Sequence, residues 1–388
     1  MRKLVNRVNF FFGILIASFF LHLSSLTVSA QSKPDSLAEA VKSKILNHFN
    51  HFTIGFYVDT YFNLTLDNKK DTSNLIPFSA NCPVRDQIRM NHAAIETYYT
   101  AENIRGKFVL QFGDAPNLLA LPGTQFIKNI DQANFGFRII KDLWVDFGYI
   151  FNPDGFESSW AINNQISTVT VMGYFEPGNV LGIKLSYKFS SRFSGGIMYG
   201  NPYSLAYKKN THPAGMIFLC YSPIENLTFS YNNYFGHQDQ MNTGIDTYLL
   251  YNNFFITYTP VKQFLLIGQF DMAAQTHSKM APDSSKTATM FSGCLQARYT
   301  LNEKYSLTAR FELFNDPDGF LSGVYTFDGK KRGLLFRGFT TGIEYRPVKF
   351  GYIRLDYRYL HANNGNNVFY SNQLDKMNIL TLTTGARF

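Results

Sequence analysis

The chain has 388 residues and a formal net charge of +8; 45% of the residues are hydrophobic, 16% aromatic and only 16% charged. A disordered protein would lack so many aromatic residues, and a disulfide-stapled domain would need more than the 3 cysteines present. Beyond the N-terminus no apolar run approaches the roughly 18 residues of a membrane-spanning helix. No Lys/Arg-rich run of the nucleic-acid-binding type occurs, so no nucleic-acid partner is expected.

Residues 1–30 have the features of a secretory signal peptide. Arg2, Lys3 and Arg7 give a basic start, the following stretch 10–23 is apolar, and a Val-Ser-Ala cleavage signal ends the segment. An uncleaved membrane anchor is the alternative. The polar residues that follow the apolar stretch, together with the cleavage signal, favour cleavage, so we expect an exported protein.

Residues 31–50 form a lead-in to the rest of the chain. A Ser-Leu-Ala-Glu sequence near its start resembles a helix capping box, and Leu37, Val41 and Ile45 recur at helical spacing. A short helix near residues 36–48 is therefore predicted. We expect a periplasmic lead-in segment, and a plug of a pore is the alternative.

Over the remainder of the chain, apolar and polar residues alternate with the period of a β-strand. In the first segment Ile54, Phe56 and Val58 fall on one face, whereas Tyr57 and Asp59 fall on the other. Such a segment has one apolar and one polar face, because strand side chains point alternately to opposite sides. About sixteen segments show the pattern, each near or above the roughly 9–11 residues of a tilted membrane-spanning strand. They are 52–63, 88–101, 105–114, 131–140, 143–151, 179–190, 193–201, 213–222, 226–235, 246–259, 263–275, 288–301, 304–315, 335–346, 350–361 and 377–388.

The connections between these segments alternate in length. Those after even-numbered segments are tight turns, such as 141–142, and those after odd-numbered segments are long. The long ones are about 64–87, 115–130, 152–178, 202–212, 236–245, 276–287, 316–334 and 362–376. Short turns at one end and long loops at the other are typical of an outer-membrane barrel. The stretch 168–176 is either a seventeenth strand or part of a long loop.

We therefore predict that residues 51–388 form an all-β, transmembrane, antiparallel up-and-down β-barrel of about 16 strands, with 18 as the alternative count. Lipid cannot satisfy the N–H and C=O groups of a sheet edge, so a membrane-spanning sheet must close on itself. An even number of strands returns the chain to its starting side. We expect an outer-membrane location, with the long loops outside and both termini in the periplasm.

Aromatic residues flank the short turns on the apolar face. Such a ring is the girdle expected where amphipathic aromatic side chains meet lipid headgroups. The predicted members are Tyr99, Phe189, Phe193, Tyr221, Tyr258, Phe264, Tyr299, Tyr305, Tyr345 and Phe388. The terminal Phe388 also resembles the signal by which barrel-assembly machinery recognises its outer-membrane clients.

The charged residues of the predicted strands lie on their polar face. An Arg or Lys on the lipid face near mid-bilayer would cost about 2–4 kcal/mol, so this segregation supports an inward polar face. The candidates for the pore lining are Arg310, Glu312, Arg354, Asp356, Arg358, Lys184, Asp146 and Glu96. The first five lie on two strands separated by one strand and are the candidates for a constriction. Two interpretations remain open: a polar channel with a slight preference for anions, or a barrel filled by ion pairs.

Three short runs resemble a known family. Residues 143–148 read Leu-Trp-Val-Asp-Phe-Gly, residues 155–158 read Gly-Phe-Glu-Ser, and residues 182–187 read Gly-Ile-Lys-Leu-Ser-Tyr. With these runs the chain resembles the β-barrel porins of Bacteroidetes, specifically their second, OmpL-like family. The resemblance covers roughly residues 51–388, implies an outer-membrane barrel with a porin role, and implies no catalytic role for the motif residues.

The sequence predicts no catalytic residue, cofactor or metal site. His92 and Glu96 share the polar face, but four residues along a strand span about 13 Å, too far for a catalytic pair. The predicted function is a porin-like channel for passive diffusion of small hydrophilic solutes. A non-conducting structural or surface-adhesion barrel is the alternative. The expected partners are the lipid bilayer, lipopolysaccharide, the barrel-assembly machinery and small solutes, with the oligomeric state left open.

Overall fold

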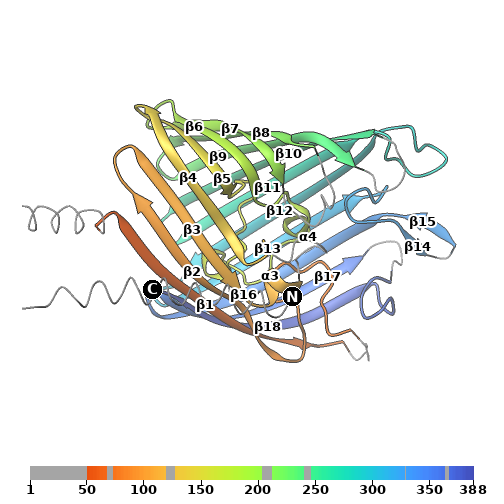
Figure 1. The fold of residues 1–388 in the computed structure, drawn as a ribbon. Coiled ribbons are helices and arrows are strands. Elements are labelled where there is room, and N and C mark those ends of the chain that lie inside the picture. Colours follow the sequence, from red (N-terminus) through yellow and green to blue (C-terminus); the bar gives the residue numbers. More distant parts are fainter. Residues whose placement is uncertain are drawn as a thin grey trace, which may run out of the picture. The chain divides into compact units, whose positions relative to one another are not determined.

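Sixteen strands pair edge to edge into one closed barrel in the computed structural model of the protein (Figure 1). The structure describes residues 50–67, 73–118, 127–202, 212–239, 246–327, 329–362 and 367–388. The predicted signal peptide 1–30 and the predicted helix near 36–48 lie outside the described residues. The chain divides after Asn50, and the unit His51–Phe388 forms the barrel.

The barrel strands follow one another around the ring with antiparallel pairing throughout. They are β1 (Phe52–Thr65), β2 (Ile88–Thr100), β3 (Ile104–Phe112), β4 (Ile130–Ile140), β5 (Leu143–Ile150), β6 (Val180–Lys188), β7 (Phe193–Pro202), β8 (Ala214–Ile224), β9 (Leu227–Asp239), β10 (Asp246–Val261), β11 (Phe264–Gln275), β12 (Ala288–Thr300), β13 (Tyr305–Asp316), β16 (Leu334–Val348), β17 (Gly351–Ala362) and β18 (Lys376–Arg387). β18 pairs with β1, from Tyr57 opposite Arg387 to Thr65 opposite Ile379. This pairing closes the sheet and leaves the barrel wall without a free edge.

The structure confirms the all-β barrel of sixteen strands, and each predicted segment corresponds to one barrel strand. Two further strands, β14 (Tyr325–Phe327) and β15 (Lys330–Arg332), pair only with each other, so the barrel does not reach eighteen. The stretch 168–176 is not a strand. It contains the short helix α4 (Val171–Phe175), which begins where the Thr170 hydroxyl accepts a hydrogen bond from the Gly173 N–H.

Two other short helices, α3 (Asp114–Leu118) and η1 (Ala161–Asn163), belong to the long connections. In the part of the chain that the structure describes, no helix has the length and apolar character needed to cross a membrane.

The alternation predicted from the sequence separates an outward apolar face from an inward polar face. On β17 the side chains of Ile353 and Leu355 are 41% and 40% exposed on the outside, whereas Arg354 and Asp356, next to them in sequence, are 0% and 1% exposed inside. The outward side chains have no protein partner layer, which is expected of a surface that contacts lipid. The inward side chains are buried by other groups of the chain.

A row of glycines crosses the inward face of three neighbouring strands. Gly148 of β5 is opposite Gly182 of β6, which is in turn opposite Gly200 of β7. A Cβ atom at Gly182 would lie 2.2 Å from the Tyr199 carbonyl oxygen, so no larger residue fits without a backbone shift. Glycine allows the wall to bend at this level, and these three positions add no side chain to the inner face.

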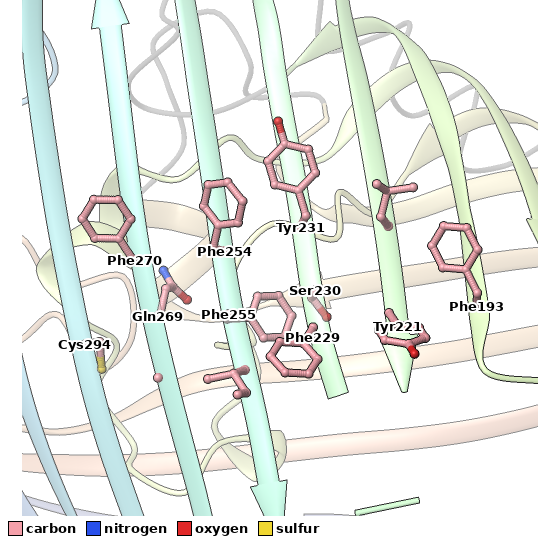
Figure 2. A pocket seen from close by; sticks show the side chains of 13 residues that line it. Phe193, Tyr221, Phe229, Ser230, Tyr231, Phe254, Phe255, Gln269, Phe270 and Cys294 are labelled. Carbon is pink, nitrogen blue, oxygen red and sulfur yellow. The ribbon is translucent and has the colours of Figure 1, made fainter. Parts of the chain in front are cut away.

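The outward face of β7–β12 carries an apolar groove of about 560 Å³, shown in Figure 2. Its floor includes Gly268 of β11, and the rings of Phe229, Phe254 and Phe270 form part of its walls. The absence of a side chain at Gly268 creates the hollow between the larger neighbours. The groove belongs to the face that contacts lipid and lies outside the lumen.

Candidate functional site

The connection between β5 and β6, residues 152–178, folds into the barrel and is called the internal loop below (Figure 1). Its backbone N–H groups hydrogen-bond to side chains of strands that are far apart around the ring. The bonds are Ile162 to the Tyr57 hydroxyl of β1 at 3.3 Å, Gly155 to Asn253 of β10 at 3.1 Å, Val171 to Glu312 of β13 at 2.7 Å, and Ser167 to Asp356 of β17 at 2.8 Å. Only a segment inside the ring reaches all four strands. The expectation that the long loops lie outside the barrel is therefore wrong for this loop.

The two ends of the internal loop lie against each other. The Asn152 side chain donates a hydrogen bond to the Pro177 carbonyl oxygen at 3.3 Å. Gly155 has a φ of +70°, a conformation that favours glycine, and a Cβ atom there would lie 2.4 Å from an oxygen of Glu176. The Pro-Asp-Gly sequence at 153–155 thus turns the chain inward directly after β5, and Glu176 packs against this turn.

Arg310 of β13 connects the barrel wall to the middle of the internal loop. Its guanidinium donates to Glu157 at 2.7 Å and to the Thr168 carbonyl oxygen at 2.8 Å. The second carboxylate oxygen of Glu157 accepts from the N–H and the hydroxyl of Thr170, the residue that caps α4. One ion pair therefore fixes the position of α4 relative to β13, and the Arg310 side chain is only 1% exposed.

Arg354 of β17 makes a second connection. It donates to the carbonyl oxygens of Ala161 at 3.1 Å and Asn164 at 2.8 Å, and it forms an ion pair with Glu344 of β16 at 2.5 Å. A guanidinium presents five N–H donors in a fixed plane, so a single arginine can bond the loop backbone and a wall carboxylate together. Arg354 therefore holds the loop backbone at η1 and at the residue that follows it.

All five predicted constriction residues face the lumen and lie beneath the internal loop. They are at most 7% exposed, and they comprise Arg310, Glu312, Arg354, Asp356 and Arg358. Arg358 forms an ion pair with Glu312 at 2.8 Å, and Glu312 also accepts from the loop. These contacts agree better with a lumen filled by ion pairs than with an open channel wall. Whether these residues line a conducting path stays a prediction.

Two carboxyl groups of the internal loop, those of Asp154 and Glu176, lie near each other, and neither forms an ion pair with a described residue. Burial raises the pKa of Asp154 to about 7, against the hydrogen bond that it accepts from Asn152. Burial and the neighbouring charges of Asp271 and Glu157 raise the pKa of Glu176 well above its usual range. Gln269 of β11 donates to Glu176 at 2.8 Å. No group of three or more His, Cys, Asp or Glu residues suited to a metal ion occurs among the described residues.

An apolar cluster surrounds α4 toward the long-loop end. Phe175 stacks on Phe314 of β13 with ring centroids 5.3 Å apart, and Phe78 from the first long connection lies 6.0 Å from Phe175 and 5.1 Å from Phe336. Met172 and Val171 are also buried in this cluster. Apolar packing therefore holds α4 in place, in addition to the ion pairs.

The wall formed by β3–β8 presents a different surface at the short-turn end. Lys184 of β6 is half-buried, lies over the ring of Phe218 at 4.7 Å, and forms no ion pair with a described residue. Asp146 pairs with Arg105 at 2.7 Å, and Glu96 of β2 pairs with Arg387 at 2.8 Å. The predicted lining residues Lys184 and Asp146 thus face the lumen on β6 and β5, away from the five residues beneath the loop. Glu96 of β2 faces the lumen beside the internal loop, in a hollow that Ser158 and Trp160 also line.

Residues 51–388 match the model of the family described as Putative beta-barrel porin-2, OmpL-like. The chain belongs to this family. It is a porin-like barrel of the outer membrane. No curated protein matches the chain.

Several solved structures, among them porins and an outer-membrane protein, resemble this OmpL-like barrel in fold. OmpF of Salmonella typhi, in complex with daunomycin, is 11% identical with a TM-score of 0.58, covering 87% of this chain and 97% of its own. The anion-selective porin from Comamonas acidovorans is 11% identical with a TM-score of 0.54, and the match covers 87% of this chain and 99% of the porin chain. OmpT of Vibrio cholerae is 12% identical with a TM-score of 0.53, and the match covers 87% of this chain and 98% of the OmpT chain. At these identities the likeness establishes the shared fold.

The predicted girdle residues of the OmpL-like barrel are half-buried or exposed, and several contact one another across neighbouring strands. The rings of Tyr305 and Tyr345 stack with centroids 4.9 Å apart, and those of Phe189 and Phe193 do so at the same separation. Phe388 is 70% exposed, and its ring stacks on that of Phe56 with centroids 5.8 Å apart. Their placement at a membrane interface stays a prediction.

Sequence reasoning missed the internal loop and the residues that anchor it, including Glu157, Ser167 and Thr168. It also left out Arg105. One signal could have indicated the loop: residues 158–175 contain no charged side chain, although they form the centre of a long connection. A solvent-exposed loop of this length would be expected to carry charge, so its absence favours burial.

Proposed function

We propose that the barrel is a passive diffusion channel for small hydrophilic solutes, which pass between the internal loop and the β3–β8 wall. The observation that carries the proposal is the one-sided polar anchoring of the loop. Its hydrogen bonds and ion pairs to the wall go to β1 and to strands from β10 to β18, and none found among the described residues reaches β3–β8. Apolar contacts do reach this side, because Val171, Met172 and Phe175 belong to one buried cluster with Val180 of β6, Met198 of β7 and Met216 of β8. The proposed route therefore runs through the polar hollows outside this cluster.

The β3–β8 side also has polar hollows that support a water-filled route. One, of about 360 Å³, lies at the short-turn end and includes Arg105, Trp144 and Lys188. Another, of about 160 Å³, includes Glu96 and Lys107 beside the internal loop. Sixteen-stranded barrels are wide enough for an aqueous lumen, and polar walls tune which solutes enter.

A non-conducting barrel is the second candidate, and the apolar cluster around α4 favours it. Val171, Met172 and Phe175 are buried in that cluster, and water does not wet an apolar constriction readily. In such a barrel the surface loops would carry the function, as in an adhesion or structural protein. Conduction decides between the two candidates.

The orientation in the membrane is part of the proposal. The even number of strands places the start of β1 and the end of β18 at the short-turn end, which we assign to the periplasm. The long loops then face the exterior and contact lipopolysaccharide, while Phe388 serves as the recognition signal for the barrel-assembly machinery. The family and fold are those of a channel, and we assign no catalytic residue.

Purified protein in planar bilayers and in liposomes tests the function. We expect discrete conductance steps and swelling with small neutral sugars that slows as sugar size increases. Folded protein gives a heat-modifiable gel band, because a closed barrel resists detergent until it is heated. Folded protein that neither conducts nor permits swelling would support the non-conducting candidate.

A further inference from the structure

The lumen holds two kinds of cationic side chain. Beneath the internal loop, Arg310, Arg354 and Arg358 each lie within 2.8 Å of a carboxylate. Near the short turns of β4–β7, Arg138 and Lys184 lie over aromatic rings, and neither forms an ion pair with a described residue. The first group is neutralised by its partners. In the second group Lys184 lies opposite Asp146 in the β5–β6 pair, which compensates part of its charge, whereas Arg138 has no carboxylate partner among the described residues.

Aromatic rings hold these cations by their faces. Arg105 and Arg138 both lie over the ring of Trp144, at 4.4 Å and 5.1 Å from its centroid, and Lys184 lies over Phe218 at 4.7 Å. A ring attracts a cation through its quadrupole and places it without cancelling its charge. Trp144 and Phe218 therefore position the basic side chains that form this part of the inner barrel surface.

The hollow of about 360 Å³ at this place is called the vestibule below. Its lining includes the cations Arg105, Lys188 and Arg192, the rings of Trp144 and Phe218, and several serines. The carboxylate of Asp146 pairs with Arg105 at 2.7 Å and leaves Lys188 and Arg192 unpaired among the described residues. Asp142 is the carboxylate among the lining residues, against three cations, so cations exceed anions here.

The serine hydroxyls give the vestibule a second chemical feature. Ser186 accepts a hydrogen bond from Arg105 at 3.2 Å, which leaves its own hydroxyl proton for another acceptor. Ser194 and Ser222 are also part of the lining. Hydroxyl groups together with cations match the oxygen atoms of a phosphate or carboxylate and the hydroxyl groups of a sugar.

We propose that the vestibule is a binding site for small hydroxylated organic anions, of the sugar-phosphate or sugar-acid class, on the path of the channel. The proposal of binding rests on the residues of the vestibule alone. The position of the vestibule on a transport route rests on the proposed function. The volume lies at the lower end of the roughly 300–1,000 Å³ range of small-molecule sites, which suits a single phosphorylated sugar. The site raises the local concentration of such solutes at the mouth of the narrow zone.

Tryptophan fluorescence measures binding without requiring conduction. The chain has 2 tryptophans, Trp144 in the vestibule and Trp160 in the internal loop, where it stacks on Tyr57. In a Trp160→Phe variant in detergent, Trp144 is the only reporter. We expect glucose 6-phosphate to change its emission saturably, and glucose or potassium chloride at equal ionic strength to leave it unchanged.

A charge-removing variant tests the residues. Lys188→Gln combined with Arg192→Gln, in the Trp160→Phe background, removes the two unpaired lining cations. We expect binding of glucose 6-phosphate to weaken about 10-fold or more, since a hydrogen bond to a charged group contributes about 1.5–3 kcal/mol. Lys262→Gln, an exposed change in the turn after β10, is the matched control and should bind as the parent does.

Planar-bilayer recordings then locate the site on the route. Glucose 6-phosphate added on the short-turn side should reduce the current of the parent at concentrations about 10-fold lower than in the double variant. Saturable fluorescence without any conductance would retain the site and reject the channel. Conductance with no saturable fluorescence change, or equal binding by parent and double variant, would overturn the vestibule proposal and leave the channel intact.

Discussion

At the residue scale, the lumen is defined by what each buried charge contacts. Arg310 and Arg354 are almost fully buried, and their donors go to the internal loop as well as to wall carboxylates. Removing one partner of a buried ion pair is strongly destabilising because the other charge is left without compensation. Such residues report on loop docking, whereas exposed cations of the vestibule, such as Lys188, report on solutes.

Arg310→Gln removes the partner of Glu157 and two donors to the internal loop. We expect loop docking to weaken by about 3–5 kcal/mol, the usual cost of breaking a buried pair. The barrel wall should persist, since its strand pairing does not depend on the loop. Single-channel recordings should show larger and noisier conductance than those of the parent. Lys349→Gln, an exposed change of equal charge, is the control; identical recordings for both variants would show that Arg310 does not hold the internal loop in place.

Asp154 gives the loop a pH dependence with a defined sign. Its pKa rises from 3.8 to about 7 on burial, so the docked loop holds this proton more tightly than a released loop does. Docking is therefore most favourable below about pH 4 and weakens as the pH rises toward about 7, and the raised pKa of Glu176 acts in the same direction. We expect more frequent conductance fluctuations at pH 8 than at pH 5. Asp154→Asn should reduce this difference, and more fluctuations at pH 5 would contradict the assignment.

At the element scale, the strands were predictable and the internal loop was not. A period of two in β17, where Ile353 and Leu355 alternate with Arg354 and Asp356, is a local property of the sequence. The contacts of the loop join residues far apart in sequence, such as Ser167 with Asp356 and Thr383, so no local pattern specifies them. Charge segregation located the lumen face, but not which of its charges the loop would cover.

A designed disulfide tests where the loop lies. The Ser167 hydroxyl oxygen is 2.6 Å from that of Thr383 on β18, so the two side chains are in contact. Ser167→Cys combined with Thr383→Cys, in a background without the native cysteines, should cross-link on oxidation. The cross-linked protein should retain a closed barrel and lose the conductance fluctuations of a mobile loop. Ser167→Cys with Thr300→Cys on β12 is the control pair, and equal cross-linking of both pairs would argue against the docked position.

At the scale of the whole molecule, the closed ring explains how a sheet can stand in a membrane. Closure through the β1–β18 pair satisfies the backbone groups that lipid cannot satisfy. The outward face carries apolar side chains, and the ends of the strands carry aromatic pairs such as Tyr305 and Tyr345. The orientation across the membrane is the remaining assignment at this scale.

Cysteine labelling tests the orientation. The native cysteines are free thiols, so we use a background in which they are replaced by serine. Ser285→Cys lies in the long connection after β11, and Lys141→Cys lies in the short turn after β4; both positions are exposed. A membrane-impermeant maleimide should label Ser285→Cys on intact cells and Lys141→Cys only after the cells are opened. The reverse pattern would invert the proposed topology.

The central claim is that solutes cross the barrel beside its internal loop, and single-channel conductance of the purified wild-type protein tests it most directly. The account predicts discrete current steps in planar bilayers from protein whose heat-modifiable band shows a closed barrel, with larger steps after Arg310→Gln releases the loop. Folded wild-type protein that carries no current would contradict it.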